Sequence, residues 1–162
     1  MPALVRTRLH TAFKKDRAVN VAWICLTLLL ATTILHYEAL NIASRFIARP
    51  RIHPRLAVLL LVLGLACAHC AEMGVYAVAY YLQRPHFGLD GTLGTFPMGF
   101  SSYLYFSAET YTSLGFGDLV PRDGLRFLAG IEALNGLLLI GWSGSFIFLA
   151  MQKVWNLKGP SH

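Results

Sequence analysis

Three long apolar segments constrain the fold of this chain more than any other feature. They cover about residues 18–40, 55–82 and 125–154, and an α-helix needs roughly 20 residues to cross a bilayer. Only 14% of the 162 residues are charged, against about 25% in an average soluble domain. Because the lipid interior offers no hydrogen-bond partner to the backbone, such segments fold as helices. The sequence therefore predicts an all-α membrane protein with three long transmembrane helices.

Charge and cysteine content indicate the surroundings of the protein. The formal net charge is +6, and the basic residues cluster beside the apolar segments, so anionic lipid head groups are a better partner than nucleic acid. Cys25, Cys67 and Cys70 all lie within apolar segments, which does not match a disulfide framework. We expect a multi-pass protein of the cell membrane that contacts membrane lipids and binds no nucleic acid.

Residues 97–111 form a fourth segment that is too short and too polar to cross a membrane. Pro97 suits the first turn of a helix, because an N–H at that position would have no partner within the helix. At membrane depth, irregular structure is tolerated only where it is buried in protein or lines a water-filled cavity. We expect a short re-entrant helix here, preceded by an exposed turret loop over residues 83–96.

Residues 112–118, which follow directly, read Thr-Ser-Leu-Gly-Phe-Gly-Asp. A cation that loses its water needs other oxygen ligands, and successive backbone carbonyls that point at one axis supply them. Such a strand needs glycine, because alternate residues take conformations that a β-carbon disfavours. The carboxyl end of the preceding helix also directs its negative dipole toward a cation. The pattern indicates an ion path lined by carbonyl groups.

With Glu109 before it and an apolar segment after Pro121, this run resembles the pore loop of potassium channels. The resemblance is strong over residues 97–139 and looser over residues 55–155. It implies a homotetramer with four filter loops around one axis. It also implies that K⁺ binds the filter residues, through the Ser113 hydroxyl and the carbonyls of Ser113, Leu114, Gly115, Phe116 and Gly117. Thr112 would support the turn just below.

Two residues of the filter depart from the family pattern. Phe116 replaces the usual tyrosine, so that a phenol hydroxyl is missing, and Leu114 replaces valine. Tyr105 and Phe106, which would support the filter, stand where many relatives have tryptophan. Potassium selectivity is still the favoured interpretation, and looser discrimination against sodium is the alternative.

Glu109 and Asp118 match a carboxyl pair that sits behind the filter in some bacterial relatives. Two carboxyl groups at such a distance do not both ionise readily, so they would share one proton and titrate as a unit. The alternative is that Glu109 only caps the loop or donates and accepts hydrogen bonds there.

His69 and Glu72 are three positions apart in the second segment and therefore share a helix face. Ionisable groups at membrane depth suggest function. A metal site with the neighbouring Cys67 and Cys70 is disfavoured, because His69 lies about 200° around the helix from Cys67. We expect a buried His69–Glu72 pair that faces the short helix or another neighbour, with pH sensing as the alternative.

The last apolar segment carries a stripe of residues at helical spacing, formed by Glu132, Asn135, Gly136, Leu139 and Ser143. This stripe either lines a water cavity below the filter or packs small and polar residues between helices. We expect Glu132 to be hydrogen-bonded near the short helix, and Leu139 and Ser143 to line the cavity. Gly136 resembles the glycine hinge of inner helices in the family, and close packing explains it equally well.

The sequence predicts three parts. Residues 1–54 form a basic N-terminal segment with an extra peripheral membrane helix, residues 55–155 form the pore domain, and residues 156–162 form a short tail. The pore domain divides into an outer helix at 55–82, the turret at 83–96, the pore helix at 97–111, the filter at 112–118 and the inner helix at 124–155.

The distribution of charges does not determine on which side of the membrane the N-terminus lies. Basic residues precede both the first and the second apolar segments, and basic residues favour the cytoplasmic side. The first helix therefore either crosses against its charge bias or lies along the membrane edge, and its apolar content favours crossing.

The favoured function is passive conduction of potassium, which requires no catalytic residue and no cofactor, so the chain is not expected to be an enzyme. Two alternatives are a weakly selective channel for monovalent cations and a non-conducting regulatory subunit of a channel complex. The apolar segments lack arginine at every third position, the pattern of a voltage sensor. Gating would then come from the filter, the inner helix, protons, lipid or a partner.

Overall fold

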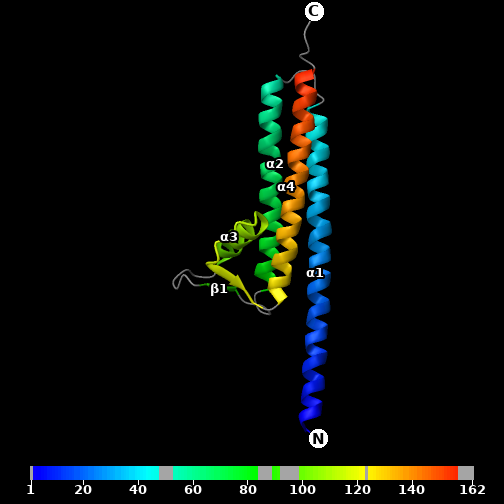
Figure 1. The fold of residues 1–162 in the computed structure, drawn as a ribbon, viewed down its shortest axis with the longest axis vertical. Coiled ribbons are helices and arrows are strands. Elements are labelled where there is room, and N and C mark those ends of the chain that lie inside the picture. The colour runs from blue at the N-terminus through cyan, green and yellow to red at the C-terminus, as the bar shows by residue number, and fades with distance from the viewer. Residues whose placement is uncertain (1, 48–52, 84–88, 92–98, 123, 157–162) are drawn as a thin grey trace, which may run out of the picture.

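The computed structural model describes residues 2–47, 53–83, 89–91, 99–122 and 124–156. Within them the elements follow in the order α1 (Pro2–Ile47), α2 (Pro54–Gln83), β1 (Leu89–Gly91), α3 (Phe100–Tyr111), β2 (Leu119–Pro121) and α4 (Gly124–Asn156). The three long helices run alongside one another, and α3 with the two strands lies at one side of this bundle (Figure 1).

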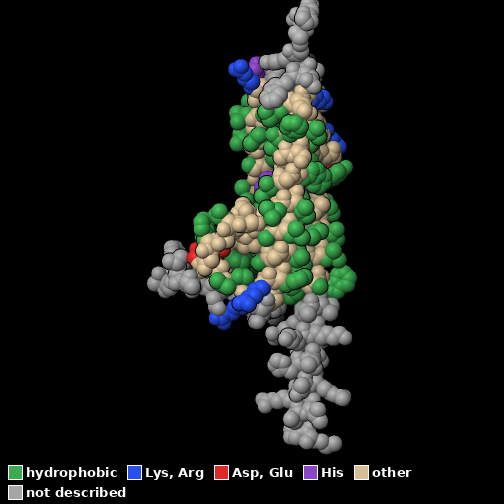
Figure 2. Space-filling view, in the orientation of Figure 1, with side chains coloured by type: hydrophobic (Ala, Val, Ile, Leu, Met, Phe, Trp, Pro, Cys, Tyr) green, Lys and Arg blue, Asp and Glu red, His purple; other side chains and the backbone are tan. Residues whose placement is uncertain are grey.

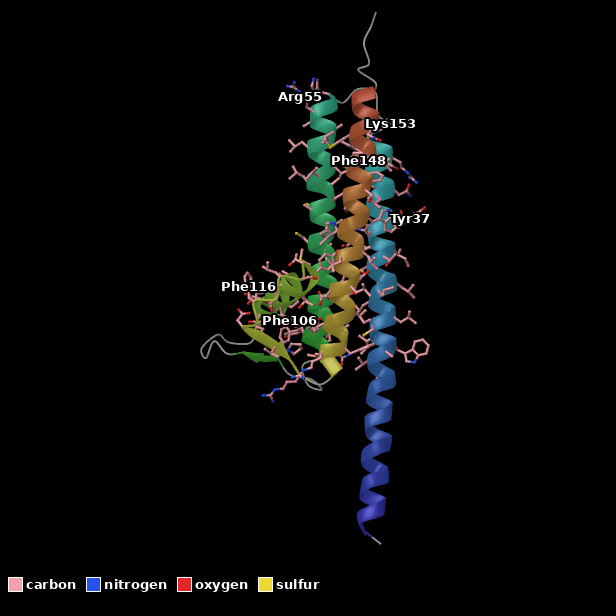
Figure 3. The ribbon with its side chains drawn as sticks, in the orientation of Figure 1. Tyr37, Arg55, Phe106, Phe116, Phe148 and Lys153 are labelled. Atoms are coloured by element: carbon pink, nitrogen blue, oxygen red, sulfur yellow. The ribbon has the colours of Figure 1, made fainter. Side chains whose placement is uncertain are left out.

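The three long helices can each cross a membrane by length and composition. The candidate spans are Asn20–Ile47, Arg55–Gln83 and Gly124–Lys153. On the face of the bundle that Figure 2 shows, hydrophobic side chains cover much of the surface, and Lys and Arg gather toward the ends. Arg55 and Lys153 mark the end that lies away from α3 (Figure 3). An apolar band between charged ends matches a bilayer, so the prediction of a helical, multi-pass membrane protein is confirmed.

α1 packs against α2 and α4, on the side of the bundle opposite α3 (Figure 1). Its inner face is formed by residues at helical spacing, namely Val21, Cys25, Thr32, His36 and Leu40, which are all buried. Its outer face is apolar and open, with Trp23 64% exposed. α1 therefore lies at one side of the bundle, and its inner face carries two polar side chains, Thr32 and His36, into the bundle.

α2 and α4 begin and end close to the ranges expected from the sequence. The outer helix was expected at 55–82 and α2 covers Pro54–Gln83. The inner helix was expected at 124–155 and α4 covers Gly124–Asn156. The short helix was expected from residue 97 and α3 begins at Phe100. Residues 97–98 and most of the turret lie outside the described residues.

No pattern in the sequence predicted the two strands. β1 and β2 pair antiparallel, with Leu89 opposite Pro121 and Gly91 opposite Leu119. Three residues are too few to show the alternation of polar and apolar residues that marks a strand. Pro121 is tolerated because both strands of a two-stranded sheet are edge strands. The pairing ties the chain that follows residues 112–118 to the middle of the turret.

An aromatic core holds α3 against α2 and α4. Its largest members are buried tyrosine and phenylalanine side chains, namely Tyr76, Tyr80, Tyr103, Phe106 and Tyr111. The rings of Tyr80 and Phe106 meet edge to face, with centroids 5.0 Å apart. A helix of 12 residues is no longer than the lower limit of the roughly 12–15 residues that an isolated helix needs to be stable in water. Packing rather than helix propensity therefore fixes the position of α3.

Gly136 of α4 lies directly against the end of α3. A β-carbon at this position would stand 2.1 Å from the backbone oxygen of Tyr111, whereas none at Gly141 or Gly144 would have any atom within 4 Å. Close packing, one of the two explanations that the sequence offered, therefore accounts for the glycine at position 136.

We predict that Gly136→Ala destabilises the protein, because the added methyl group overlaps the Tyr111 carbonyl and one of the two helices must shift. Overpacking typically costs about 1–3 kcal/mol, so the thermal unfolding midpoint of the purified protein in detergent should fall. Gly141→Ala, on the same helix, is the matched control and should not lower the midpoint. Equal midpoints for wild type and Gly136→Ala would contradict the close contact.

Candidate functional site

The segment that follows α3 has an alternating backbone. Ser113, Gly115 and Gly117 have φ angles of 57°, 54° and 79°. The left-handed region is open to glycine but costs about 1–2 kcal/mol for a residue with a β-carbon. The glycine spacing predicted this alternation at 115 and 117, and Ser113 adopts it in spite of its side chain. Strain of this kind is found where the surrounding structure holds the backbone in place.

The N–H groups of this segment point back at α3. Those of residues 113–115 donate to main-chain carbonyls in the last turn of α3 at 2.8–3.2 Å. The N–H of Phe116 donates to Glu109 Oε2 at 3.2 Å. All peptides described here are trans, and a trans peptide directs its carbonyl opposite to its N–H. The carbonyls of residues 112–115 therefore face away from α3.

The side of the segment that carries these carbonyls is uncovered in the single chain. Residues 112–117 are all exposed, and the side chains of Leu114 and Phe116 are 59% and 66% exposed. Phe116 lies on the side of the molecule away from α1 (Figure 3). In residues 112–117, which we call the strand, the N–H groups of residues 113–116 are already hydrogen-bonded and successive carbonyl oxygens face an open side. This is the chemistry of a cation site.

Three side chains brace this strand from behind. Phe116 stacks on Tyr105, with ring centroids 6.4 Å apart and planes 4° from parallel. The Tyr105 hydroxyl donates to Asp118 Oδ2 at 2.9 Å, and the carboxyl group of Asp118 lies near that of Glu109. Burial and then the nearby Asp118 carboxylate raise the pKa of Glu109. The structure thus brings the expected carboxyl pair together, and Tyr105 supplies a phenol hydroxyl that residue 116 lacks.

Phe106 does not support this strand, contrary to the sequence-based expectation. Its side chain is buried and packs on Tyr80 of α2. Consecutive residues of a helix point in directions about 100° apart, so Tyr105 and Phe106 cannot both face the strand. Tyr105 takes the supporting position and Phe106 joins the aromatic core.

Behind α3, three groups of buried polar side chains join the helices. The first group consists of Tyr80, Ser107 and Glu132. Glu132 accepts a hydrogen bond from the Tyr80 hydroxyl at 2.5 Å and lies 2.5 Å from Ser107 Oγ. Ser107 Oγ is also 2.8 Å from the carbonyl of Met73. These contacts are all satisfied when Ser107 donates to the carbonyl and a protonated Glu132 donates to Ser107. The expected contact of Glu132 with the short helix is present.

The second group joins α4 to α1 and α2. The side-chain amide of Asn135 donates to Thr32 Oγ1 at 2.7 Å and to the Tyr76 hydroxyl at 3.1 Å. Asn135 and Thr32 are buried. Because an unpaired polar group is costly in an apolar interior, these bonds favour one rotation of α1 about its axis.

The third group is a closed ring of five side chains, which we call the polar ring. It consists of Glu72, Tyr111, His69, Ser143 and His36 and draws on all four helices. The Tyr111 hydroxyl bonds to Glu72 Oε2 and lies 2.8 Å from His69 Nδ1. Ser143 Oγ lies 3.0 Å from His69 Nε2 and 3.3 Å from His36 Nε2. His36 Nδ1 closes the ring at 2.9 Å from Glu72 Oε1.

The polar ring contains the predicted His69–Glu72 pair. His69 Nδ1 lies 3.1 Å from Glu72 Oε2, and the pair meets α3 through Tyr111, as expected. Sequence reasoning missed His36. The sequence did contain a signal for His36. Thr32 and His36 are polar residues four positions apart, and they share the helix face of Cys25. Cys67 and Cys70 are both exposed and take no part in the ring.

The expectation that Leu139 and Ser143 line a water cavity is not met within the described subunit. Both side chains are buried, as is Asn135. The reason is that α1 covers this face of α4, where Ser143 meets His36. A periodic stripe identifies residues that share a face but not the neighbour which that face meets.

Comparisons with known proteins agree with a channel. Residues 56–153 match a family model described as "Ion channel". One relative, described as "Uncharacterized membrane protein YdjJ" of Bacillus subtilis (strain 168), is 35% identical over 78 residues. That alignment spans 48% of this chain but only 23% of the relative. No solved structure matches the chain.

We predict that Tyr105→Phe loosens the strand, because it removes the hydroxyl that bonds Asp118 and keeps the ring under Phe116. A lost hydrogen bond of this kind contributes about 0.5–1.5 kcal/mol. Backbone amides of residues 112–120 should exchange with deuterium faster, which mass spectrometry of the purified protein measures. Tyr37→Phe, at an exposed tyrosine of α1, is the matched control and should leave that exchange unchanged. If Tyr105→Phe left the exchange unaltered, the Tyr105 hydroxyl would not support the strand.

We predict that Glu109 makes stability depend on pH. Since its pKa is raised in the folded protein, its stabilising contribution is complete below about pH 4.3, the value for a free glutamate. That contribution is lost as the pH rises through the raised pKa. Glu109→Gln cannot titrate, so its thermal midpoint should vary less over this range than that of wild type. Identical pH profiles would show that Glu109 does not titrate in this way.

Proposed function

We propose that this chain, which belongs to the ion channel family, conducts potassium ions passively through a pore lined by the backbone of residues 112–117. One observation carries the proposal. The N–H groups of the strand are bonded to α3 and Glu109, while its carbonyls face an open side. Carbonyl oxygens of this kind replace the hydration shell of K⁺. The proposed ligands are the Ser113 hydroxyl and the carbonyls of Ser113, Leu114, Gly115 and Phe116.

A single chain supplies only one wall of such a pore. A dehydrated K⁺ ion needs oxygens on several sides, and potassium filters use four copies of the loop. The exposed strand of residues 112–117 and the exposed apolar side chains of α4, such as Leu134 and Leu138, are free to meet neighbouring copies. The proposed assembly is therefore a homotetramer, with the strand at its axis and α1 at its rim.

The proposed orientation in the cell membrane follows from the ends of the helices. Arg55 and Lys153 lie at the end of the bundle away from α3 (Figure 3), and basic residues favour the cytoplasmic side. The N-terminus of α1 lies toward the opposite end (Figure 1). In this arrangement α1 crosses the bilayer, and the filter and the N-terminus both face outward.

The test is potassium flux through purified full-length protein in liposomes. Wild type should pass K⁺, and Gly115→Asp should abolish the flux. Gly115→Ala is the sharper variant, because it adds only a methyl group at a φ of 54° that disfavours side chains. Gly144→Ala, where a β-carbon would meet no atom within 4 Å, is the matched control and should conduct. Equal leakage through wild type and Gly115→Asp would overturn the proposal.

Ion competition in the same assay separates the alternatives. A K⁺ flux that excess Na⁺ does not reduce supports strict selectivity. A comparable Na⁺ flux indicates a weakly selective cation channel, for which Phe116 gives a reason, since it is braced by ring stacking and not by a hydroxyl of its own. Flux that appears only after a partner chain is added indicates a regulatory subunit.

A further inference from the structure

The polar ring contains a set of ligands that conduction through residues 112–117 does not use. His36, His69 and Glu72 each present one nitrogen or oxygen atom, and these atoms all lie within 4.8 Å of one another. The two Nδ1 atoms approach the two carboxylate oxygens of Glu72 at 2.9 and 3.1 Å. Three donors from two helices therefore converge on one small volume.

The spacing of these donors is close to that around a zinc ion. Two imidazoles and one carboxylate form a known zinc ligand set, with bond lengths of about 2.0–2.2 Å. In a tetrahedron with those bonds, neighbouring ligand atoms lie roughly 3.3–3.6 Å apart. The observed contacts of 2.9 and 3.1 Å are shorter by a few tenths of an ångström. Small outward movements of the side chains would therefore open a position for the ion.

The atoms around the three donors also suit a metal site. An imidazole that binds a metal through one nitrogen usually donates the other ring N–H to an acceptor. Here the Nε2 atoms of His69 and His36 both face Ser143 Oγ, at 3.0 and 3.3 Å. The Tyr111 hydroxyl bonds to the carboxylate of Glu72. Both imidazoles and the carboxylate would thus be oriented by residues that bind no metal themselves.

Charge gives a third reason. The side chains of His36 and Glu72 are fully buried and that of His69 is 16% exposed, within helices that can span a membrane. A carboxylate at such a depth needs a compensating positive charge. The basic side chains that pair with Glu72 among the described residues are the two imidazoles. A divalent ion would supply that charge directly.

From these three observations we infer that His36, His69 and Glu72 form a binding site for a divalent transition-metal ion of the zinc class. The ion fastens α1 to α2 beside Tyr111, the last residue of α3. His36 lies outside the matched residues 56–153, so the site is complete only through the additional helix. This set differs from the cysteine-containing set that the sequence disfavoured. The inference does not rest on ion conduction and is tested without a flux assay.

The first experiment uses the full-length protein, purified without a polyhistidine tag and treated with a chelator. Zn²⁺ binding is measured by calorimetry, and Co²⁺ binding by visible absorption. We expect one saturable ion per chain and no thiolate-to-cobalt charge-transfer band, because Cys67 and Cys70 lie outside the polar ring. A wild-type protein that binds neither ion overturns the inference, as does a spectrum dominated by thiolate ligands.

Variants then locate the ion. His36→Gln and His69→Gln should abolish saturable binding, and Ser143→Ala should weaken it by about 10- to 100-fold, as loss of a residue that orients a ligand does. His53→Gln, at an exposed histidine that lies before α2, is the matched control and should bind like wild type. Wild-type affinity in His36→Gln would overturn the inference.

A spectroscopic measurement on wild type does not depend on how the variants fold. X-ray absorption of the zinc-loaded protein should show scattering from two imidazoles and an oxygen, without sulfur. A first shell that contains sulfur, or one that lacks imidazole, would place the ion elsewhere and overturn the inference.

Discussion

The arrangement of this protein depends on one requirement, that a backbone which presents carbonyl oxygens to one side must bond its N–H groups on the other. The last turn of α3 and the carboxyl group of Glu109 meet that requirement for residues 113–116. They can do so only while α3 keeps its position. The aromatic core and the contact with Gly136 hold α3 in that position. The packing of the other helices therefore determines where the strand of residues 112–117 lies.

Buried polar side chains determine how each helix is rotated about its own axis. Apolar surfaces alone pack in many rotations within lipid, because lipid tails are as apolar as the side chains. The hydrogen bond that Thr32 accepts from α4 and the hydrogen bond between His36 and α2 select one rotation for α1. Tyr80 and Ser107 do the same for α2 and α3 through Glu132. Among the described residues, every buried side-chain nitrogen and oxygen has a partner.

The sequence predicted those features that single segments determine. Hydropathy located the long helices, and the spacing of Gly115 and Gly117 predicted the alternating backbone. Features that depend on two segments were harder to predict. The partner of Glu72 on α1, the face of α4 that carries Ser143 and the pairing of β1 with β2 all depend on how separate elements meet. Phe106 shows the same limit, since residue type suggested support of the strand and helix geometry placed it in the core.

The contact between Gly136 and Tyr111 couples two parts of the molecule that are usually considered separately. Tyr111 touches α4 through its backbone oxygen and belongs to the polar ring through its hydroxyl, and the strand begins at the next residue. A rotation or bend of α4 at Gly136 must therefore either displace the first residues of the strand or break this contact. The long helix and the strand form a single mechanical unit, and a force on one is transmitted to the other without any intervening loop.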